Sequence, residues 1–282
     1  MSRGELYAAV RQILEKSGTD SSGFEAGCIF EKAFGRPFPM IIMDRELDVP
    51  EETSSEIMKM AEKRSSGYPL QYILGEWDFF GSTFKIGEGV LIPRPDTETL
   101  VEQTLDICRK NNIKAPVIAD LCSGSGCIAV TLSRELPGSE VYAVELSDDA
   151  LPYLRENVRQ SGQNIHIIKG DVLDSSAVKA VPEPDIIVSN PPYLTEKDMS
   201  ELQKEVACEP EKALFGGRDG LDFYRKMTPL WKNSLKKGGF IIYEFGMGQH
   251  NDVSRILEEN GFKDIQLSRD TGGIIRTAAA QK

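Results

Sequence analysis

Histidine is scarce in this sequence, because only His166 and His250 occur among its 282 residues. Neither lies near a serine or a cysteine in a pattern that is typical of a nucleophile. A reaction that depends on a histidine base, or a metal site built mainly from histidine, is therefore difficult to assemble from this chain.

Paired cysteines are also missing. The five cysteines are odd in number and form no CxxC pair: Cys28, Cys108, Cys122, Cys127 and Cys208. We therefore expect neither a metal site nor a disulfide framework, and a reducing cytosol is the default environment.

The chain has little basic charge and no long hydrophobic run. Its formal net charge is -11, whereas a general nucleic-acid binder needs a basic surface that displaces counterions. No apolar run approaches the ~20 residues that cross a bilayer. The N-terminus, "MSRGELYAAVRQILEKSG", carries charges throughout, unlike a signal peptide. We expect a cytoplasmic protein that binds neither membranes nor, directly, nucleic acid.

Residues 2 to about 75 show helical periodicity and almost no strand signal. One helical face is predicted from Leu6, Val10, Ile13 and Leu14, and a second helix from Phe24, Cys28, Ile29 and Phe30. Pro37 and Pro39 bound a short third helix. In "DVPEETSSEIMKMAEKRSSG", a proline and acids begin a helix and basic residues end it. The pattern predicts a small helical bundle.

The rest of the chain alternates between strands and helices. "GEWDFFGSTFKIG" predicts a β-hairpin in which two aromatic-rich runs flank Gly81-Ser82. Helices are expected between most of the later strands, so the fold class is α/β with a mostly parallel sheet covered on both faces. The C-terminal "GGIIRTAAAQ" is expected to add an antiparallel strand. Earlier strands are predicted at Val117–Leu121, Val141–Leu146, Ile165–Ile168, Ile186–Ser189, Phe240–Phe245 and Ile265–Leu267.

A glycine-rich loop follows the first of these strands, in "VIADLCSGSGCIAV". Gly124, Gly126 and Ala129 satisfy G-x-G-x-x-A, a pattern that lets the backbone turn tightly and approach a ligand at a helix N-terminus. Glu145 ends the next strand, 19 residues after Gly126, where a carboxylate can accept hydrogen bonds from ribose hydroxyls. The pattern suits NAD and S-adenosylmethionine equally well, and the alternative is a tight strand-to-helix turn without a ligand.

A third strand ends in "IIKGDVLD". Asp171 there is a candidate acceptor for an adenine amino group, with Val172 against the ring. Alone this signal is weak, because a strand that ends in Gly-Asp is often only a turn.

The fourth strand ends in "SNPPY". Since proline has no N–H, Pro191 and Pro192 accept hydrogen bonds but donate none, and Asn190 adds a side-chain carbonyl oxygen. Such a loop suits a guest that carries an NH₂ group, whose two hydrogens both need acceptors. Tyr193 offers a flat face to a planar guest. The alternative is a rigid Pro-Pro turn with a tyrosine that faces the core.

These properties match the requirements of methylation at a planar amine or amide nitrogen. Acceptors on both hydrogens would polarise the N–H bonds and aim the nitrogen lone pair at a methyl donor, by positioning and electrostatics. No strong base is then required, in keeping with the scarcity of histidine.

At this point the chain resembles a known family. The segments "YILGEWDFFG", "LIPRPDTETLVE", "DLCSGSG", "NPPY" and "EPEKALFGGRDGLDFYR" are similar to those of the HemK/PrmC family of peptide chain release factor glutamine methyltransferases. The resemblance runs from about Gly67 to the C-terminus. It implies methyl transfer from S-adenosylmethionine, which becomes S-adenosylhomocysteine, to the glutamine amide nitrogen of the Gly-Gly-Gln motif in class I release factors.

The resemblance also implies an architecture and a set of site residues. It suggests a helical substrate-recognition domain at residues 1–75, a β-hairpin linker at 76–94, and a class I, Rossmann-like, seven-stranded methyltransferase domain at 95–282 of a monomer. Glu145 would hold the cofactor's ribose, and Asp171 with Val172 its adenine. Asn190, Pro191, Pro192 and Tyr193 would hold the target glutamine, Asn190 also bordering the cofactor. The methionine and ribose portion would lie against Cys122, Ser123, Gly124, Ser125 and Gly126.

The sequence departs from the family pattern at Cys122, which stands where the family usually has glycine, so the conformation of that position is in question. Arg94 and the segment Pro95–Glu98 either border the cofactor or merely begin a capped helix at Thr97–Leu105, since Asp96 and Thr97 are ordinary N-cap residues. The acidic segment "TEKDMSELQKEVACEPEKALFGGRDG" is expected either to lie over the site or to form a solvated connection.

Other functions compete with this hypothesis. Amino-group DNA methyltransferases use the same Asn-Pro-Pro-Tyr logic on a flipped base, but they need a basic channel. A ribosomal-protein glutamine methyltransferase has the same target group. A dehydrogenase would bind NAD, and a non-catalytic adaptor would bind a translation factor without transferring a methyl group.

Overall fold

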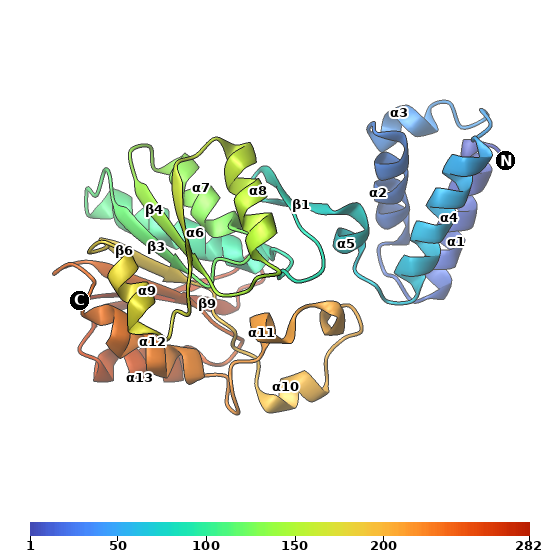
Figure 1. Ribbon diagram of the computed structural model, residues 1–282. Coiled ribbons are helices and arrows are strands. Elements are labelled where there is room, and N and C mark those ends of the chain that lie inside the picture. The colour runs from blue at the N-terminus through green and yellow to red at the C-terminus, as the bar shows by residue number, and fades with distance from the viewer. The chain divides into compact units, whose positions relative to one another are not determined.

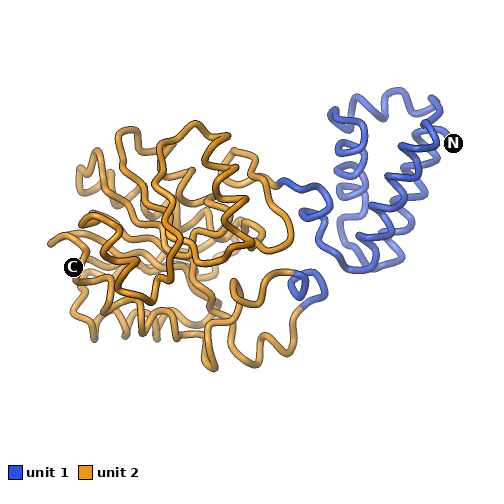
Figure 2. Tube along the Cα trace, viewed as in Figure 1, with its two compact units in different colours: residues 1–76, 203–208 blue, residues 77–202, 209–282 orange.

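The computed structural model describes all residues from Met1 to Lys282, which form two units (Figure 2). Unit 1 contains Met1–Glu76 and the short segment Gln203–Cys208, and unit 2 contains Trp77–Leu202 and Glu209–Lys282. No helix combines the length and the apolar character that crossing a bilayer requires.

Unit 1 is helical. A capping box of Ser2 and Glu5 begins the first helix, and Leu6, Val10 and Leu14 bury one face of it, as predicted. The helices are α1 (Arg3–Lys16), α2 (Ser22–Phe34), α3 (Phe38–Ile42), α4 (Glu51–Ser65) and α5 (Leu70–Leu74), with a 3₁₀ turn, η1, at Val206–Cys208 (Figure 1). The predicted second helix is confirmed as α2, which buries the face that carries Ala26, Ile29 and Phe30 and leaves Phe24, on the opposite face, 63% exposed.

An ion pair is buried in unit 1. Arg64 donates two hydrogen bonds to the Glu25 carboxylate, at 2.5 and 3.0 Å, and both residues are less than 9% exposed. Arg64 also lies 2.8 Å from a carboxylate oxygen of Glu205. The contact ties the segment Gln203–Cys208 to α4 within this unit.

A hairpin of β1 (Glu76–Phe79) and β2 (Ser82–Lys85) precedes the main sheet. Its turn is Phe80-Gly81, one residue earlier than expected. Both residues have positive φ, 48° and 73°, which a two-residue hairpin turn of the favoured twist requires. Arg134 binds the turn at the Phe80 carbonyl, 2.8 Å away.

The main sheet of unit 2 has seven strands in the order β5-β4-β3-β6-β7-β9-β8. Six strands run in one direction, and only β9, which lies between β7 and β8, is antiparallel to its neighbours. This confirms the predicted class I methyltransferase sheet and its antiparallel C-terminal strand. The strands are β3 (Val117–Leu121), β4 (Glu140–Glu145), β5 (Ile165–Lys169), β6 (Ile186–Ser189), β7 (Phe240–Glu244), β8 (Lys263–Arg269) and β9 (Ile275–Gln281).

Helices cover both faces of this sheet (Figure 1). Alternate strand residues face opposite ways: Ile118 joins the core under α6, α7 and α8, whereas Ala119 and Leu121 join the core under α9, α12 and α13. The helices are α6 (Pro95–Lys110), α7 (Cys127–Glu135), α8 (Leu151–Ser161), α9 (Ser175–Ala180), α10 (Glu196–Ser200), α11 (Glu211–Leu214), α12 (Asp222–Lys232) and α13 (His250–Glu259).

Strand order reverses between β3 and β6. The chain runs outward from β3 through β4 to β5, then returns to pair β6 with the other edge of β3. In doubly wound sheets, ligands bind at the carboxyl ends of the strands where the order reverses. The loops after Leu121, Glu145 and Ser189 are therefore brought together at one edge of the sheet.

Candidate active site

The loop between β3 and α7 contains a run of backbone conformations that L side chains rarely adopt. Cys122, Gly124 and Gly126 have φ of 62°, 54° and 81°. Cys122 thus takes the left-handed conformation at a cost of roughly 1–2 kcal/mol. Cysteine at position 122, where the family usually has glycine, therefore still adopts the positive φ of this loop. Burial raises the pKa of the Cys122 thiol above its usual range, so the thiol stays protonated at neutral pH.

The two glycines of this loop have different roles. A Cβ on Gly126 would lie 2.4 Å from Leu154 Cδ1, so this glycine permits α7 to pack against α8. A Cβ on Gly124 would meet nothing closer than Val90 Cγ2 at 3.8 Å. Gly124, unlike Gly126, therefore has room for a Cβ, which would make an ordinary contact with Val90.

Glu145 joins the ends of β3 and β4. Its Oε2 accepts a hydrogen bond from the Gly124 N–H and its Oε1 from the Ser147 N–H, each at 2.7 Å. A carboxylate oxygen can accept more than one hydrogen bond. Glu145 therefore holds the loop and keeps acceptor capacity for the hydroxyls of a ribose.

The residues after β5 already make some contacts within the protein. Asp171 Oδ1 accepts a hydrogen bond from the Leu173 N–H at 2.8 Å, so one oxygen of this carboxylate already serves the turn. Val172 is only 4% exposed, and its carbonyl accepts a hydrogen bond from Trp231 Nε1 at 2.7 Å. The Val172 side chain belongs mainly to the core, with a small edge left for a ligand.

The Asn-Pro-Pro-Tyr turn begins where β6 ends. Ser189 Oγ donates to the Leu121 carbonyl at 2.7 Å, which joins the turn to the glycine loop. Pro191 and Pro192 are buried, whereas Asn190 and Tyr193 are half-buried. Burial raises the pKa of Tyr193, so its hydroxyl stays neutral. The turn is a rigid part of the sheet edge, with its two polar-tipped side chains still accessible.

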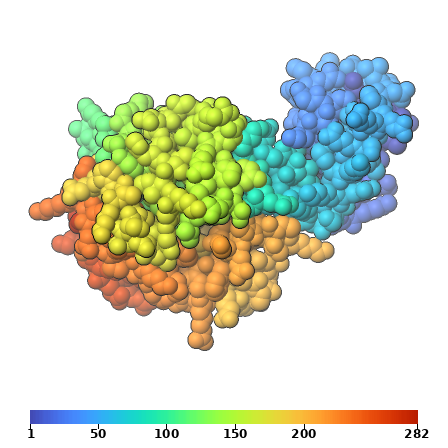
Figure 3. Space-filling model, in the orientation of Figure 1, coloured from blue at the N-terminus to red at the C-terminus, as the bar shows by residue number.

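The far end of the acidic segment packs against this turn. A Cβ on Gly216 would lie 2.6 Å from the Pro192 carbonyl oxygen, and one on Gly220 would lie 2.2 Å from that of Tyr193. Gln249 Nε2 donates to the Tyr193 carbonyl at 3.0 Å. Further upstream, α10 buries none of its residues and lies at the surface (Figure 3). Only the glycine-rich end of the segment thus closes on the turn.

Sequence reasoning missed Thr97, Glu244 and Gln249. Thr97 lies in the first turn of α6, beyond its N-cap position, and accepts a hydrogen bond from Asn190 Nδ2 at 3.2 Å. Arg94 occupies the N-cap position of α6, but its side chain makes no capping hydrogen bond. It forms an ion pair with Glu209 instead. Asp96 instead lies 2.8 Å from Arg276. The sequence did contain a signal for Glu244, because this carboxylate lies at the end of β7, the strand next to β6.

Glu244 is 1% exposed, and burial raises its pKa to about 7. The Thr97 side chain and the charges of Arg276 and Arg94 act in the opposite direction and lower this pKa. Asp120, at the end of β3, has its pKa raised to about 7 for the same reason, burial. Two carboxyls whose pKa is raised toward neutrality therefore lie near the carboxyl ends of β3 and β7, on either side of β6.

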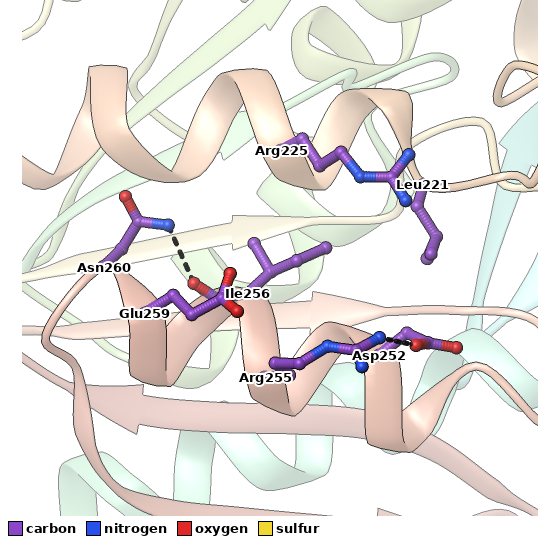
Figure 4. A pocket seen from close by; sticks show the side chains of 7 residues that line it. All are labelled: Leu221, Arg225, Asp252, Arg255, Ile256, Glu259 and Asn260. Carbon is purple, nitrogen blue, oxygen red and sulfur yellow. Dashed lines mark hydrogen bonds and ion pairs between the residues drawn. The ribbon is translucent and has the colours of Figure 1, made fainter.

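A hollow of about 220 Å³ elsewhere in unit 2 lies between α12 and α13 (Figure 4). Its two arginines are already paired, Arg225 with Asp219 and Arg255 with Asp252. No residue at a strand end lines this hollow, so it is separate from the site at the carboxyl ends of the strands.

Comparison with known proteins agrees with the fold. The model of the methyltransferase small domain matches residues 97–217, and that of the PrmC N-terminal domain matches residues 5–75. A release factor glutamine methyltransferase of Fusobacterium nucleatum is 35% identical, with 99% of this chain and 78% of the relative aligned. One of Clostridium botulinum is 35% identical over 96% of this chain and 95% of the relative.

The chain belongs to the PrmC/HemK family of release factor glutamine methyltransferases.

Solved structures support the fold of this family member at lower identity. A methyltransferase of Pyrococcus furiosus aligns with a TM-score of 0.53 and 16% identity over 72% of this chain and 90% of its own. The methyltransferase domain of the family depends on S-adenosylmethionine. The acceptor oxygens of Glu145 fit the hydroxyls of its ribose.

Proposed function

We propose that this chain methylates the side-chain amide nitrogen of the glutamine in the Gly-Gly-Gln motif of class I release factors, and that Asn190, Pro191 and Tyr193 hold that glutamine. Membership of the family makes the chain an S-adenosylmethionine-dependent glutamine methyltransferase whose substrates are release factors. The roles of individual residues are our proposal.

The supporting observation is that the glycine loop and the Asn-Pro-Pro-Tyr turn lie on adjacent parallel strands, β3 and β6, joined by the Ser189–Leu121 hydrogen bond of 2.7 Å. A cofactor held by one loop then lies beside a substrate held by the other. Holding two reactants at ~3–3.5 Å removes much of the entropic barrier to their reaction.

The cofactor would be held by strand-end groups. Glu145 would accept hydrogen bonds from ribose hydroxyls, and the second oxygen of Asp171 would accept from the adenine amino group, with Val172 at the ring edge. The loop Cys122–Gly126 would line the methionine portion. When bound, S-adenosylmethionine supplies an electrophilic methyl group on a positively charged sulfur.

The target amide would be held by acceptors alone. Asn190 Oδ1 and the Pro191 carbonyl would each accept one N–H of the glutamine NH₂, while the Tyr193 ring packs against the amide plane. As an N–C bond forms and the C–S bond breaks, one amide proton leaves to water. Acceptors that strengthen as the nitrogen becomes positive stabilise the transition state more than the ground state.

The remaining expectations are part of the proposal. The helical region 1–75 would recognise the release factor, residues 76–94 would link it to the catalytic domain 95–282, and the chain would act as a cytoplasmic monomer. Light scattering of the purified protein tests the oligomeric state, and binding of a release factor to a chain lacking residues 1–75 tests the recognition role.

The decisive experiment is mass spectrometry of a purified release factor incubated with the chain and the methyl donor, with Asn190→Ala beside wild type. We expect one methyl group on the Gly-Gly-Gln glutamine, and a turnover ~10²–10³ lower in the variant with cofactor affinity within a few fold. Asn251→Ala, an exposed change on α13, is the matched control.

Methyl transfer to a ribosomal protein in place of a release factor would contradict the proposed substrate. Normal turnover of Asn190→Ala would contradict the proposed role of the turn.

A further inference from the structure

The side chain of Asn190 is held from behind by two buried residues. Its Nδ2 donates a hydrogen bond to Thr97 Oγ1 at 3.2 Å, and the Thr97 side chain in turn lowers the pKa of the Glu244 carboxyl and so favours its ionised form. Thr97 is 3% exposed and Glu244 is 1% exposed. The contact links the end of β6, the first turn of α6 and the end of β7, which are separate in the sequence.

The direction of these hydrogen bonds follows from the chemistry of the groups. A carboxylate only accepts, and a hydroxyl has a single hydrogen. When Glu244 is ionised and the Thr97 hydroxyl donates its hydrogen to that carboxylate, the hydroxyl can only accept from its other neighbour. It therefore accepts from the Asn190 NH₂ and disfavours the flipped carboxamide, in which the Asn190 oxygen would face another oxygen.

The orientation of this carboxamide matters because its two ends have opposite character. With NH₂ toward Thr97, the Oδ1 end is available to an incoming NH₂ group. After a flip about the last side-chain bond, the NH₂ end would face the NH₂ of the substrate, donor against donor. The two rotamers are nearly isosteric, so shape alone does not select between them.

We propose that Thr97 and Glu244 form a relay that positions Asn190, holding its Oδ1 toward the substrate amide. This inference rests on the proposed function and deepens it: neither residue would touch the substrate, and both would act through Asn190.

The burial of Glu244 supports a dedicated role. One of its oxygens, Oε2, has no hydrogen-bond partner although the residue is buried, an arrangement that opposes folding. Asp96, Arg276 and Arg94 are the charged groups that act on it, and the Tyr224 hydroxyl donates to its backbone carbonyl at 2.8 Å. A neutral residue of similar size would stabilise this part of the core better, so packing does not account for a carboxylate here.

The first test compares substitutions of one buried hydroxyl. Thr97→Val keeps the shape but removes the hydroxyl, and Thr97→Ser restores it. Thr104→Val is the matched control, because Thr104 lies on the same helix, is fully buried, and donates only to the Leu100 carbonyl. We expect a kcat about 10-fold lower for Thr97→Val, within about 3-fold of wild type for Thr97→Ser, and near wild type for Thr104→Val.

Two further measurements separate positioning from folding. The cofactor Kd of Thr97→Val should stay within about 2-fold of wild type. Glu244→Gln, whose amide can donate to the Thr97 hydroxyl, should lower kcat without lowering the thermal midpoint of unfolding, since it removes a buried carboxyl. A lower midpoint with unchanged kcat would overturn the relay.

A double-mutant cycle between Thr97→Val and Asn190→Ala is decisive. If Thr97 acts through Asn190, its substitution should change kcat less than about 2-fold when residue 190 is already alanine. Independent, multiplying losses would overturn the relay while the function of Asn190 stands. Normal turnover of Thr97→Val beside an impaired Asn190→Ala would do the same. Full activity of Asn190→Ala would overturn the proposed function together with the relay.

Discussion

The backbone N–H of Gly124 donates to the carboxylate of Glu145 at 2.7 Å. The loop of one strand is therefore held by the last residue of its neighbour, since Leu121 and Val144 pair in adjacent parallel strands just before it. The same carboxylate that would bind the ribose of the cofactor also shapes the loop that would line its methionine portion.

Glu145→Gln should therefore weaken cofactor binding about 10-fold or more. Glutamine has one acceptor oxygen where Glu145 uses two, so either the Gly124 or the Ser147 N–H loses its partner. Isothermal titration with S-adenosylmethionine measures the change. Glu135→Gln, at the partly exposed end of α7, is the control and should bind normally. An unchanged dissociation constant for Glu145→Gln would remove this carboxylate from the site.

Tyr193 should contribute through its ring more than through its hydroxyl. Tyr193→Phe keeps the flat face and should retain kcat/KM within about 3-fold, whereas Tyr193→Ala should lose about 10-fold or more. Steady-state kinetics with a release factor substrate measures both. Equal activity of the two variants would contradict packing of the ring against the glutamine amide.

The stability of unit 2 should fall as pH rises from about 5 to 8. Burial raises the pKa of Asp120 from 3.8, and that of Glu244 from 4.5, to about 7. The folded state therefore binds more protons than the unfolded state between these values, and its stability is lost as pH rises through the folded pKa. Each group should cost on the order of 3 kcal/mol at the upper end.

Urea unfolding at pH 5 and pH 8 checks this dependence. Carboxyls whose pKa is lowered, such as Glu156 at about 2, are ionised in both states over this window and do not contribute. Asp120→Asn should have a smaller loss of stability between the two pH values than wild type. Identical losses in the two proteins would show that Asp120 does not titrate in this range.

Among charged residues of unit 1, removal of one partner of the Arg64–Glu25 ion pair should lower the free energy of unfolding most. Arg64→Met leaves a carboxylate buried without its partner and should lower the free energy of unfolding by about 3–5 kcal/mol. Replacing both residues, with Glu25→Leu added, should recover much of that loss. Arg11→Met breaks an exposed pair with Glu15 and should cost about 0.5 kcal/mol or less. Chemical denaturation monitored by circular dichroism distinguishes these outcomes.

Much of unit 2 could be predicted because its signals are local. Val117–Leu121 and Ile186–Ser189 are confirmed as strands at both ends, since short apolar runs between turn residues predict buried parallel strands. The hairpin turn was misplaced by one residue because Phe80 adopts a positive φ, which sequence patterns rarely indicate for an aromatic residue.

Some residues of the candidate site could likewise be predicted from the sequence, and others could not. The glycine loop, Glu145 and the Asn-Pro-Pro-Tyr turn were predictable, because strand ends of a parallel sheet converge and their residue types have a recognisable chemistry. Thr97 was predicted as a possible N-cap residue, whereas α6 begins at Pro95 and Thr97 lies in its first turn. Its actual partner, Asn190, lies 93 residues away in the chain.

The order of residues along the chain thus decided which strands form, which loops carry acceptors and which chemistry those loops can perform. Folding alone decided that the amide of Asn190 meets Thr97, that Glu244 becomes a buried carboxyl behind them, and that Gly216 and Gly220 close on the turn. The physical reason is that such contacts depend on the order and register of β3, β6 and β7, which the burial of the whole core selects and no single segment encodes.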